Sequence, residues 1–173
     1  MNETMCHIEI FDEETGLWEY VPVSSDPEPI NCYCNNLEHF FSTHLYYLFI
    51  TLENEGTQPL FPMYKGLPVD CSEVIEKAYH FLTEEVCMCQ NASYVNLSDL
   101  LSFDYDKIFN LTDMGKKELE MLYPEIYESK KQRLAHREWL GDEFFSELET
   151  VKKRFDKYPK CRIVYFLYRI NLS

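Results

Sequence analysis

The segment near the end of the chain constrains the fold most. Residues 161–170 read CRIVYFLYRI, a run of β-branched, aromatic and other apolar residues. Such residues favour strands, and a strand that is apolar on both faces is typical of an interior position in a sheet. We therefore expect residues 161–170 to form a central strand around which the rest of the fold assembles.

Two further β-rich segments lie near the start of the chain. Residues 6–11 and 17–23 flank the run DEETG at 12–16, whose glycine suits a hairpin bend. Residues 24–30, SSDPEPI, hold too many prolines for a strand and indicate an exposed loop. The sequence therefore predicts an N-terminal β-hairpin.

The middle of the chain has a helical pattern. From Asn36 to Gly56, apolar residues recur at helical spacing and predict an amphipathic helix. Asp70, with Glu73 after it, forms a variant of the capping box and predicts a helix from there through Leu82.

Two more helices are expected nearer the C-terminus. Asn96 with Asp99 repeats the capping pattern ahead of a short helix over 97–103. Gly141-Asp142 begins the last helix, which has an acidic first turn, a basic last turn and a stop at Pro159. Its residues at helical spacing are Phe144, Phe145, Leu148, Val151 and Phe155.

Together these elements predict an α+β fold. The small, mostly antiparallel sheet consists of the N-terminal hairpin plus the C-terminal strand, and several helices pack with it. A chain of 173 residues has the size of one domain, and no repeat or linker divides it, so we expect a single domain over 1–173.

Charge is distributed unevenly along the chain, whose net charge is −14. Residues 1–110 hold 19 acidic and 3 basic side chains, whereas 111–173 hold 11 acidic and 13 basic ones. This balance disfavours direct binding to nucleic acid or to an anionic membrane. The acidic part is either a surface kept soluble by its own repulsion or a surface that meets a basic partner.

Other features point to the cytoplasm. No apolar run approaches the roughly 20 residues of a membrane span, and the first residues lack the pattern of a signal peptide. Seven cysteines in a chain of this size indicate reduced thiols.

The two Cys-x-Cys pairs leave one chemical question open. Cys32 with Cys34 and Cys87 with Cys89 could bring four thiols to one zinc ion, but structural zinc sites separate paired ligands by about two residues or more. Ordinary reduced cysteine is the favoured interpretation. We therefore expect no metal and no cofactor, and because no catalytic motif is present we assign no catalytic residue.

The candidate binding residues lie between His44 and Ser72. Tyr46 and Tyr47 are consecutive on the predicted helix, so both cannot face the core, and exposed tyrosine is favoured at recognition surfaces. Lys65 could attract an anion to the start of the helix after Pro68, although Asp70 would compete for the amides there. The ligand-binding or partner-binding candidates are Tyr46, Tyr47, Tyr64, Lys65, Asp70 and Ser72.

The same stretch carries a resemblance to a known group of proteins. The runs Tyr46-x-Leu48-Phe49-x-x-Leu52 and Lys65-Gly66-Leu67-Pro68-x-Asp70-x-Ser72, with Pro59 between them, are similar to R-N-Y-x-L-F-x-x-L-A and R-G-L-P-x-D-x-S. These motifs are typical of a widespread family of small acidic uncharacterised bacteriophage proteins. The likeness continues over residues 93–101 and ends in residues 162–166.

The resemblance implies a phage origin, and hence the cytoplasm of an infected bacterium, more than it implies a mechanism. The family has no assigned activity. His44 and Lys65 stand where the family tends to have arginine, and the two cations are not interchangeable at a planar anion. Residues 88–92 replace a polar run that contains histidine and aspartate, so acid–base chemistry is not expected there.

These observations lead to one expectation with two alternatives. We expect a non-enzymatic phage accessory protein, a counter-defence inhibitor that binds and blocks a host factor through an acidic, tyrosine-rich surface. A basic nucleic-acid-binding defence enzyme would suit that surface. The alternatives are a sponge that sequesters a nucleotide immune signal, with Lys65 on its phosphate, and a small hydrolase whose carboxylates cannot be identified. Homo-oligomer formation stays open.

Overall fold

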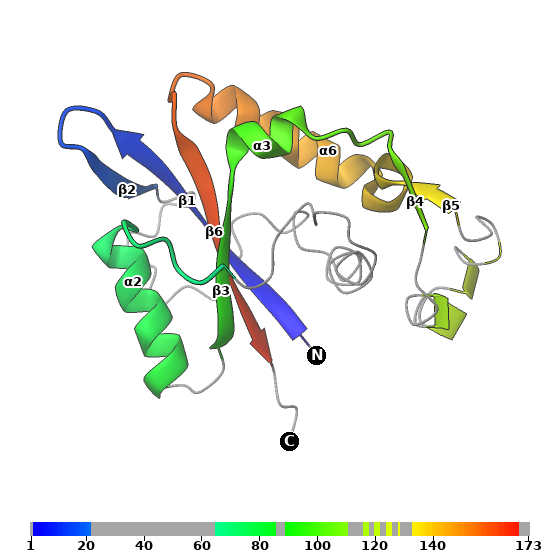
Figure 1. Ribbon diagram of the computed structural model, residues 1–173, viewed down its shortest axis with the longest axis horizontal. Helices are drawn as coiled ribbons and strands as arrows, with labels where there is room; N and C mark the ends of the chain where they lie inside the picture. The colour runs from blue at the N-terminus through cyan, green and yellow to red at the C-terminus, as the bar shows by residue number, and fades with distance from the viewer. Residues whose placement is uncertain are drawn as a thin grey trace.

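The fold is built on one antiparallel sheet, seen in a computed structural model (Figure 1). The structure describes residues 2–21, 65–85, 89–110 and 133–169, together with scattered positions between 116 and 128. The helix predicted over 36–56 lies outside these residues.

Among the described residues, four strands form the sheet in the order β2-β1-β6-β3. They are β1 (Asn2–Asp12), β2 (Leu17–Val21), β3 (Cys89–Asn96) and β6 (Cys161–Arg169). The predicted α+β fold and the interior position of the C-terminal strand are confirmed, because β6 pairs with β1 on one side and β3 on the other. The sequence did not predict β3.

The predicted hairpin joins β1 to β2. Gly16 has a φ of 71°, a conformation that side chains disfavour, and its N–H donates to the Asp12 carbonyl over 2.8 Å. The Asp12 carboxylate accepts hydrogen bonds from the Glu14 N–H and the Thr15 hydroxyl, which lower its pKa. Local turn chemistry thus fixes the register of the first two strands.

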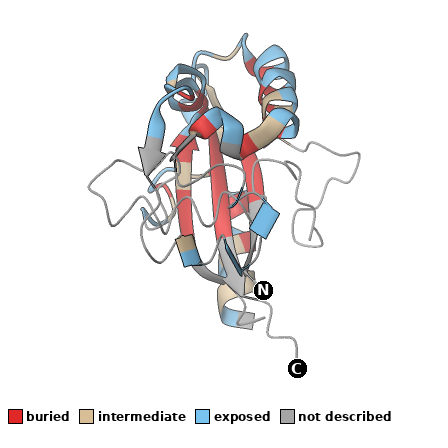
Figure 2. Cartoon of the chain, turned by 90° about the vertical axis from the view of Figure 1, so that its right-hand side faces the viewer, coloured by how far each residue is buried: buried red, intermediate tan, exposed pale blue. Residues whose placement is uncertain are grey.

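One face of the sheet packs against α2 (Glu73–His80), which continues as a π-helical turn, η3 (Phe81–Glu85). The side chains of Ile75 and Ala78 on α2 form a buried cluster with those of strand residues Ala92, Val164 and Phe166. Residues on the opposite face of the sheet are also buried, among them Cys6, Ile8, Ile163 and Tyr165. The sheet is therefore covered on both sides, and the buried positions follow its strands (Figure 2).

Two further helices lie along the upper edge in Figure 1. They are α3 (Leu97–Ser102) and α6 (His136–Phe155), and α3 contacts β3, β6 and α6. The predicted apolar spacing in α6 is confirmed for Phe144, Leu148, Val151 and Phe155, which are buried, whereas Phe145 is only partly buried.

The start of α6 differs from the prediction. The helix begins at His136 rather than at Gly141, and Gly141, with φ 73° and ψ 172°, breaks it into two parts. The glycine therefore marks a kink inside the helix. A two-stranded ladder of β4 (Ile108–Asn110) and β5 (Arg133–Ala135), not predicted from the sequence, precedes it.

The start of α2 also differs from the prediction. Asp70 does not cap this helix: the N-cap is Ser72, whose own side chain makes no capping hydrogen bond. The α-helix ends at His80 and not at Leu82, which falls in η3. The reason is that the Asp70 carboxylate is bound elsewhere, as the next section describes.

Within the residues that the structure describes, no helix is both long enough and apolar enough to cross a membrane.

Candidate functional site: the Arg162 network and its loop

A buried arginine organises the most distinctive polar site. Arg162 is the second residue of β6 and only 4% of its side chain is exposed. The sheet register places it opposite Glu9 of β1, whose side chain is fully buried. Opposite charges at directly paired positions on one face of a sheet attract each other, so the register itself forms the first ion pair.

The guanidinium of Arg162 binds two carboxylates. Its Nε donates to Oε2 of Glu9 over 2.7 Å, and its Nη1 donates to Oδ1 of Asp70 over 2.7 Å. Its Nη2 also donates to the Asp70 backbone carbonyl over 3.2 Å. These hydrogen bonds between charged groups are the strong class, and they compensate the cost of burying Glu9 and Arg162.

Aromatic rings enclose the same guanidinium. Its central carbon lies 3.8 Å from the centroid of the Trp18 ring and 5.8 Å from that of Tyr94, a favourable arrangement for a cation. The Trp18 indole Nε1 donates to Oδ2 of Asp70 over 2.9 Å. Both carboxylate oxygens of Asp70 therefore have a donor.

Glu9 also holds the beginning of α2. Its Oε1 accepts a hydrogen bond from the backbone N–H of Ser72 over 2.6 Å. A carboxylate is favourable at a helix N-terminus, where backbone N–H groups point outward. The sequence suggested that Asp70 would compete with an anion at this position, but the carboxylate that occupies it is Glu9.

The segment 65–72, which we call the anchored loop, connects this network to the edge strand β3. The Gly66 N–H donates to the Ala92 carbonyl over 3.0 Å, and Gly66 has a φ of 79°, a conformation that glycine adopts readily. The Lys65 ammonium lies 4.8 Å from the centroid of the Tyr94 ring and donates to the Tyr94 carbonyl over 3.4 Å. The loop is therefore held at both ends.

The structure brings together the three predicted site residues that it describes. Lys65, Asp70 and Ser72 all lie on the anchored loop; Lys65 and Asp70 are exposed and Ser72 is buried. Tyr46, Tyr47 and Tyr64 lie outside the described residues. Whether these six residues bind a partner stays a prediction.

Sequence reasoning missed Glu9, Trp18 and Arg162. The available signal was Arg162, a charged residue at the second position of a strand whose next six residues carry no charge. A buried charge requires a partner, but nothing local to residues 161–170 indicated that the partners would be Glu9 and Asp70.

The electrostatics of the loop indicate structural order rather than acid–base chemistry. Partial burial raises the pKa of the Asp70 carboxyl, but the hydrogen bond and the charge of Arg162 outweigh it, and the pKa is lowered. Burial and the nearby charges of Glu9 and Glu76 raise the pKa of the Cys71 thiol to about 11. Cys71 is therefore a protonated thiol near neutral pH and a poor nucleophile.

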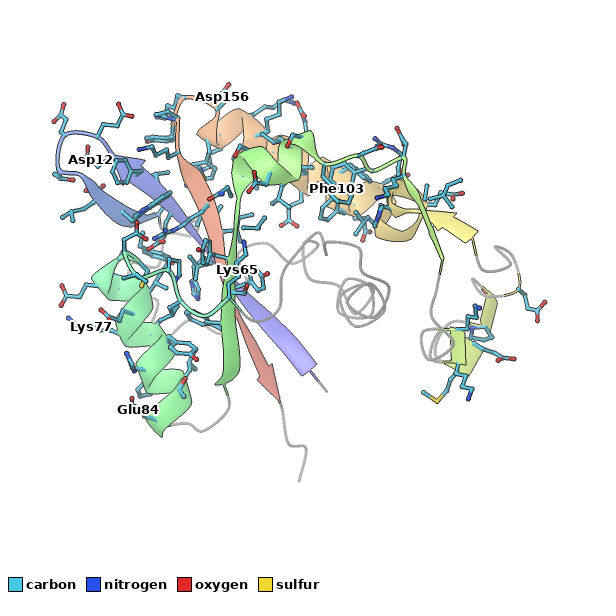
Figure 3. The ribbon with its side chains drawn as sticks, viewed as in Figure 1. Asp12, Lys65, Lys77, Glu84, Phe103 and Asp156 are labelled. Atoms are coloured by element: carbon cyan, nitrogen blue, oxygen red, sulfur yellow. The ribbon has the colours of Figure 1, made fainter. Side chains whose placement is uncertain are left out.

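The exposed surface beside the anchored loop is acidic. Asp70 and the α2 residues Glu73 and Glu76 are exposed there, and the Lys77 ammonium pairs with Glu73 at 2.5 Å. Lys77 lies on the outer side of α2 and Glu84 lies in η3, whereas Lys65 lies beside β3 (Figure 3). No group of three or more potential metal ligands occurs among the residues that are described.

No protein-family model, curated protein or solved structure matches the chain.

Proposed function

We propose that this chain is a non-enzymatic accessory protein of a bacteriophage that binds a host protein and blocks it. The phage origin is supported by the resemblance of the motifs around residues 46–72 and would place the protein in the cytoplasm of the infected bacterium. The observation that carries the binding role is the anchored loop, because a buried ion network fixes a loop whose tip is open to solvent.

Val69 is the central contact of the proposed surface. It is fully exposed, although its neighbours Pro68 and Ser72 are buried. An apolar side chain on a backbone that is already ordered loses little conformational entropy when a partner covers it. The tip of the anchored loop therefore has the properties of an interface anchor.

The charge around this anchor specifies the class of partner. Asp70, Glu73 and Glu76 lie on the loop and the first part of α2, and all three are exposed. Complementary charge steers association and disfavours partners of the wrong sign. The partner is therefore a protein with a basic groove, such as a nucleic-acid-binding defence enzyme, and the acidic surface would occupy that groove.

Capture from a bacterial host lysate tests the proposal. We expect the immobilised protein to retain a basic host protein, and retention should fall steeply as salt is raised, because exposed charges are screened. Val69→Lys and Glu76→Lys should each reduce retention about tenfold or more. The matched controls are Ile108→Lys, at another exposed apolar residue, and Asp142→Lys, at an acidic residue on α6.

Two results would contradict the proposal. One is the absence of any retained host protein at low salt. The other is retention that falls equally in the loop variants and in their controls, which would show that contact does not depend on the anchored loop.

A further inference from the structure

A concave feature lies at the end of the sheet where β6 begins. It is a pocket of about 510 Å³ between β2, the start of α3 and the end of α6. Asp156, at that end of α6, is labelled in Figure 3. Pockets for small ligands have volumes of about 300–1,000 Å³, so this one has the size of a ligand site.

The floor of the pocket is apolar and its wall is aromatic. Leu97, Phe155 and Cys161 line it and are buried, while Trp18 and Tyr158 line it and are partly exposed. An apolar surface with a few polar groups at its rim is the usual composition of a small-molecule site. Flat aromatic molecules suit such a wall because their rings pack against Trp and Tyr.

The rim carries positive charge in a protein that is otherwise strongly acidic. Residues 152–160 contain five basic side chains and one acidic one, and Lys152 and Lys160 from this stretch line the pocket. The Lys152 ammonium lies 3.8 Å from a Glu149 carboxylate oxygen, and both side chains are about half exposed. A long, exposed ion pair of this kind is weak, so Lys152 can leave Glu149 and bind a ligand.

Helix electrostatics account for only part of this charge. Lys152 lies in the last turn of α6, where a cation complements the macrodipole. Lys160 lies beyond the helix, which ends at Phe155, and its ammonium sits 4.2 Å from the Phe11 ring centroid, a contact that does not neutralise it. Among the lining residues that the structure describes, Asp156 is the one carboxylate and opposes an anion, so the two lysines leave these residues with an excess of positive charge.

We infer that this pocket binds a small organic anion with a flat aromatic body. The rings of Trp18 and Tyr158 would contact the body, and Lys152 and Lys160 would bind its carboxylate or phosphate. The pocket shares Trp18 with the Arg162 network, since the Trp18 indole N–H donates to Asp70 of the anchored loop. Its ligand is nevertheless a small molecule, and it does not use Val69.

Trp18 provides a direct reporter for the test. The chain has two tryptophans, so the Trp18 indole N–H gives one of two resonances, which a Trp18→Phe variant assigns. We expect saturable shifts of this resonance on titration with 1-naphthoate or with adenosine monophosphate, and a comparison of the two distinguishes a carboxylate from a nucleotide ligand. Inorganic phosphate alone should bind much more weakly, because it lacks the aromatic body.

The charge variants make the test specific. Lys152→Glu should weaken binding about tenfold or more, since a hydrogen bond to a charged group is lost. Lys153→Glu is the matched control, because Lys153 is the adjacent, exposed cation on α6 and does not line the pocket. It should bind within about twofold of the original protein.

Three outcomes would overturn the inference. They are the absence of saturable shifts at millimolar concentrations of both aromatic anions, equal losses in Lys152→Glu and Lys153→Glu, and binding of inorganic phosphate as tight as that of the aromatic anions. None of these measurements involves a host protein, so their failure would be distinct from failure of the proposed function.

Discussion

The buried guanidinium of Arg162 and the carboxylate of Asp70 form a hydrogen-bonded ion pair between residues 92 positions apart, with Nη1 and Oδ1 separated by 2.7 Å. The Arg162 side chain is 4% exposed, whereas that of Asp70 is 66% exposed. The pair therefore joins the core to the surface, and the position of the anchored loop depends on the interior strand β6.

Replacing Arg162 with methionine should destabilise the whole fold. The Arg162→Met variant leaves Glu9 buried without its cation, and removing one partner of a buried pair costs about 3–5 kcal/mol. The free energy of unfolding in urea measures this loss. Arg137→Met is the control, because Arg137 forms an exposed ion pair with Asp106 at 2.9 Å and should cost no more than about 1 kcal/mol.

The double variant Arg162→Met with Glu9→Gln should recover part of the lost stability, since it removes the unpaired buried charge. Equal losses in Arg162→Met and Arg137→Met would show that the buried network contributes no more than a surface pair.

Replacing Asp70 with asparagine should loosen the anchored loop and leave the sheet intact. Asp70→Asn removes the charge that binds Arg162 and one of the two side-chain oxygens that accept from Arg162 and Trp18, a loss of about 1 kcal/mol. Amide hydrogen exchange should quicken at residues 66–72 but not in β1 or β6. Unchanged exchange in the loop would contradict the role assigned to this pair.

The same carboxylate gives the loop a pH dependence. The folded-state pKa of Asp70 is lowered from its ordinary value of 3.8, so the folded state favours the ionised form. Its contribution to stability is complete above that ordinary value and is lost as pH falls through the lower folded-state pKa. The protection factors of the loop amides, which correct for the intrinsic pH dependence of exchange, should therefore fall at acid pH in the original protein and change less in Asp70→Asn.

His7 should make the fold sensitive to mild acid. Its ring lies between those of Tyr20 and Phe166, at centroid distances of 6.0 and 4.9 Å, and neither of its nitrogens has a hydrogen-bond partner among the described residues. Burial lowers its pKa from 6.5 to about 4. The unfolded chain therefore binds a proton more readily than the folded one between these values.

The sign of the effect follows from this difference. Stability should decrease as pH falls below 6.5 and level off near pH 4, with a total loss of about 3 kcal/mol from this residue. Urea unfolding at several pH values should show a flatter dependence for His7→Phe. If the stability of His7→Phe depended on pH as strongly as that of the original protein, the acid sensitivity would come from other groups.

Local sequence was sufficient for the elements whose causes are local. The β-branched and aromatic run at 161–169 predicted β6, and the hairpin bend needed only Asp12 and Gly16. The sequence CQNASYVN of β3 is rich in small and polar residues and has little strand propensity. It forms a strand because the neighbouring β6 provides the hydrogen bonds and the apolar contacts.

The class of fold, the interior strand and the hairpin could be predicted from the sequence, because these depend on residues a few positions apart. The binding partner of the Asp70 carboxylate, in contrast, is set by the tertiary structure. The sequence around Asp70 matches a helix cap, but the Asp70 carboxylate binds Arg162 instead. The pairing of β1 with β6 also holds Arg162 against Glu9, which is 153 positions away in the sequence. The strength of a charged hydrogen bond depends on which groups the fold buries together. The separation of two residues along the chain does not indicate which groups these are.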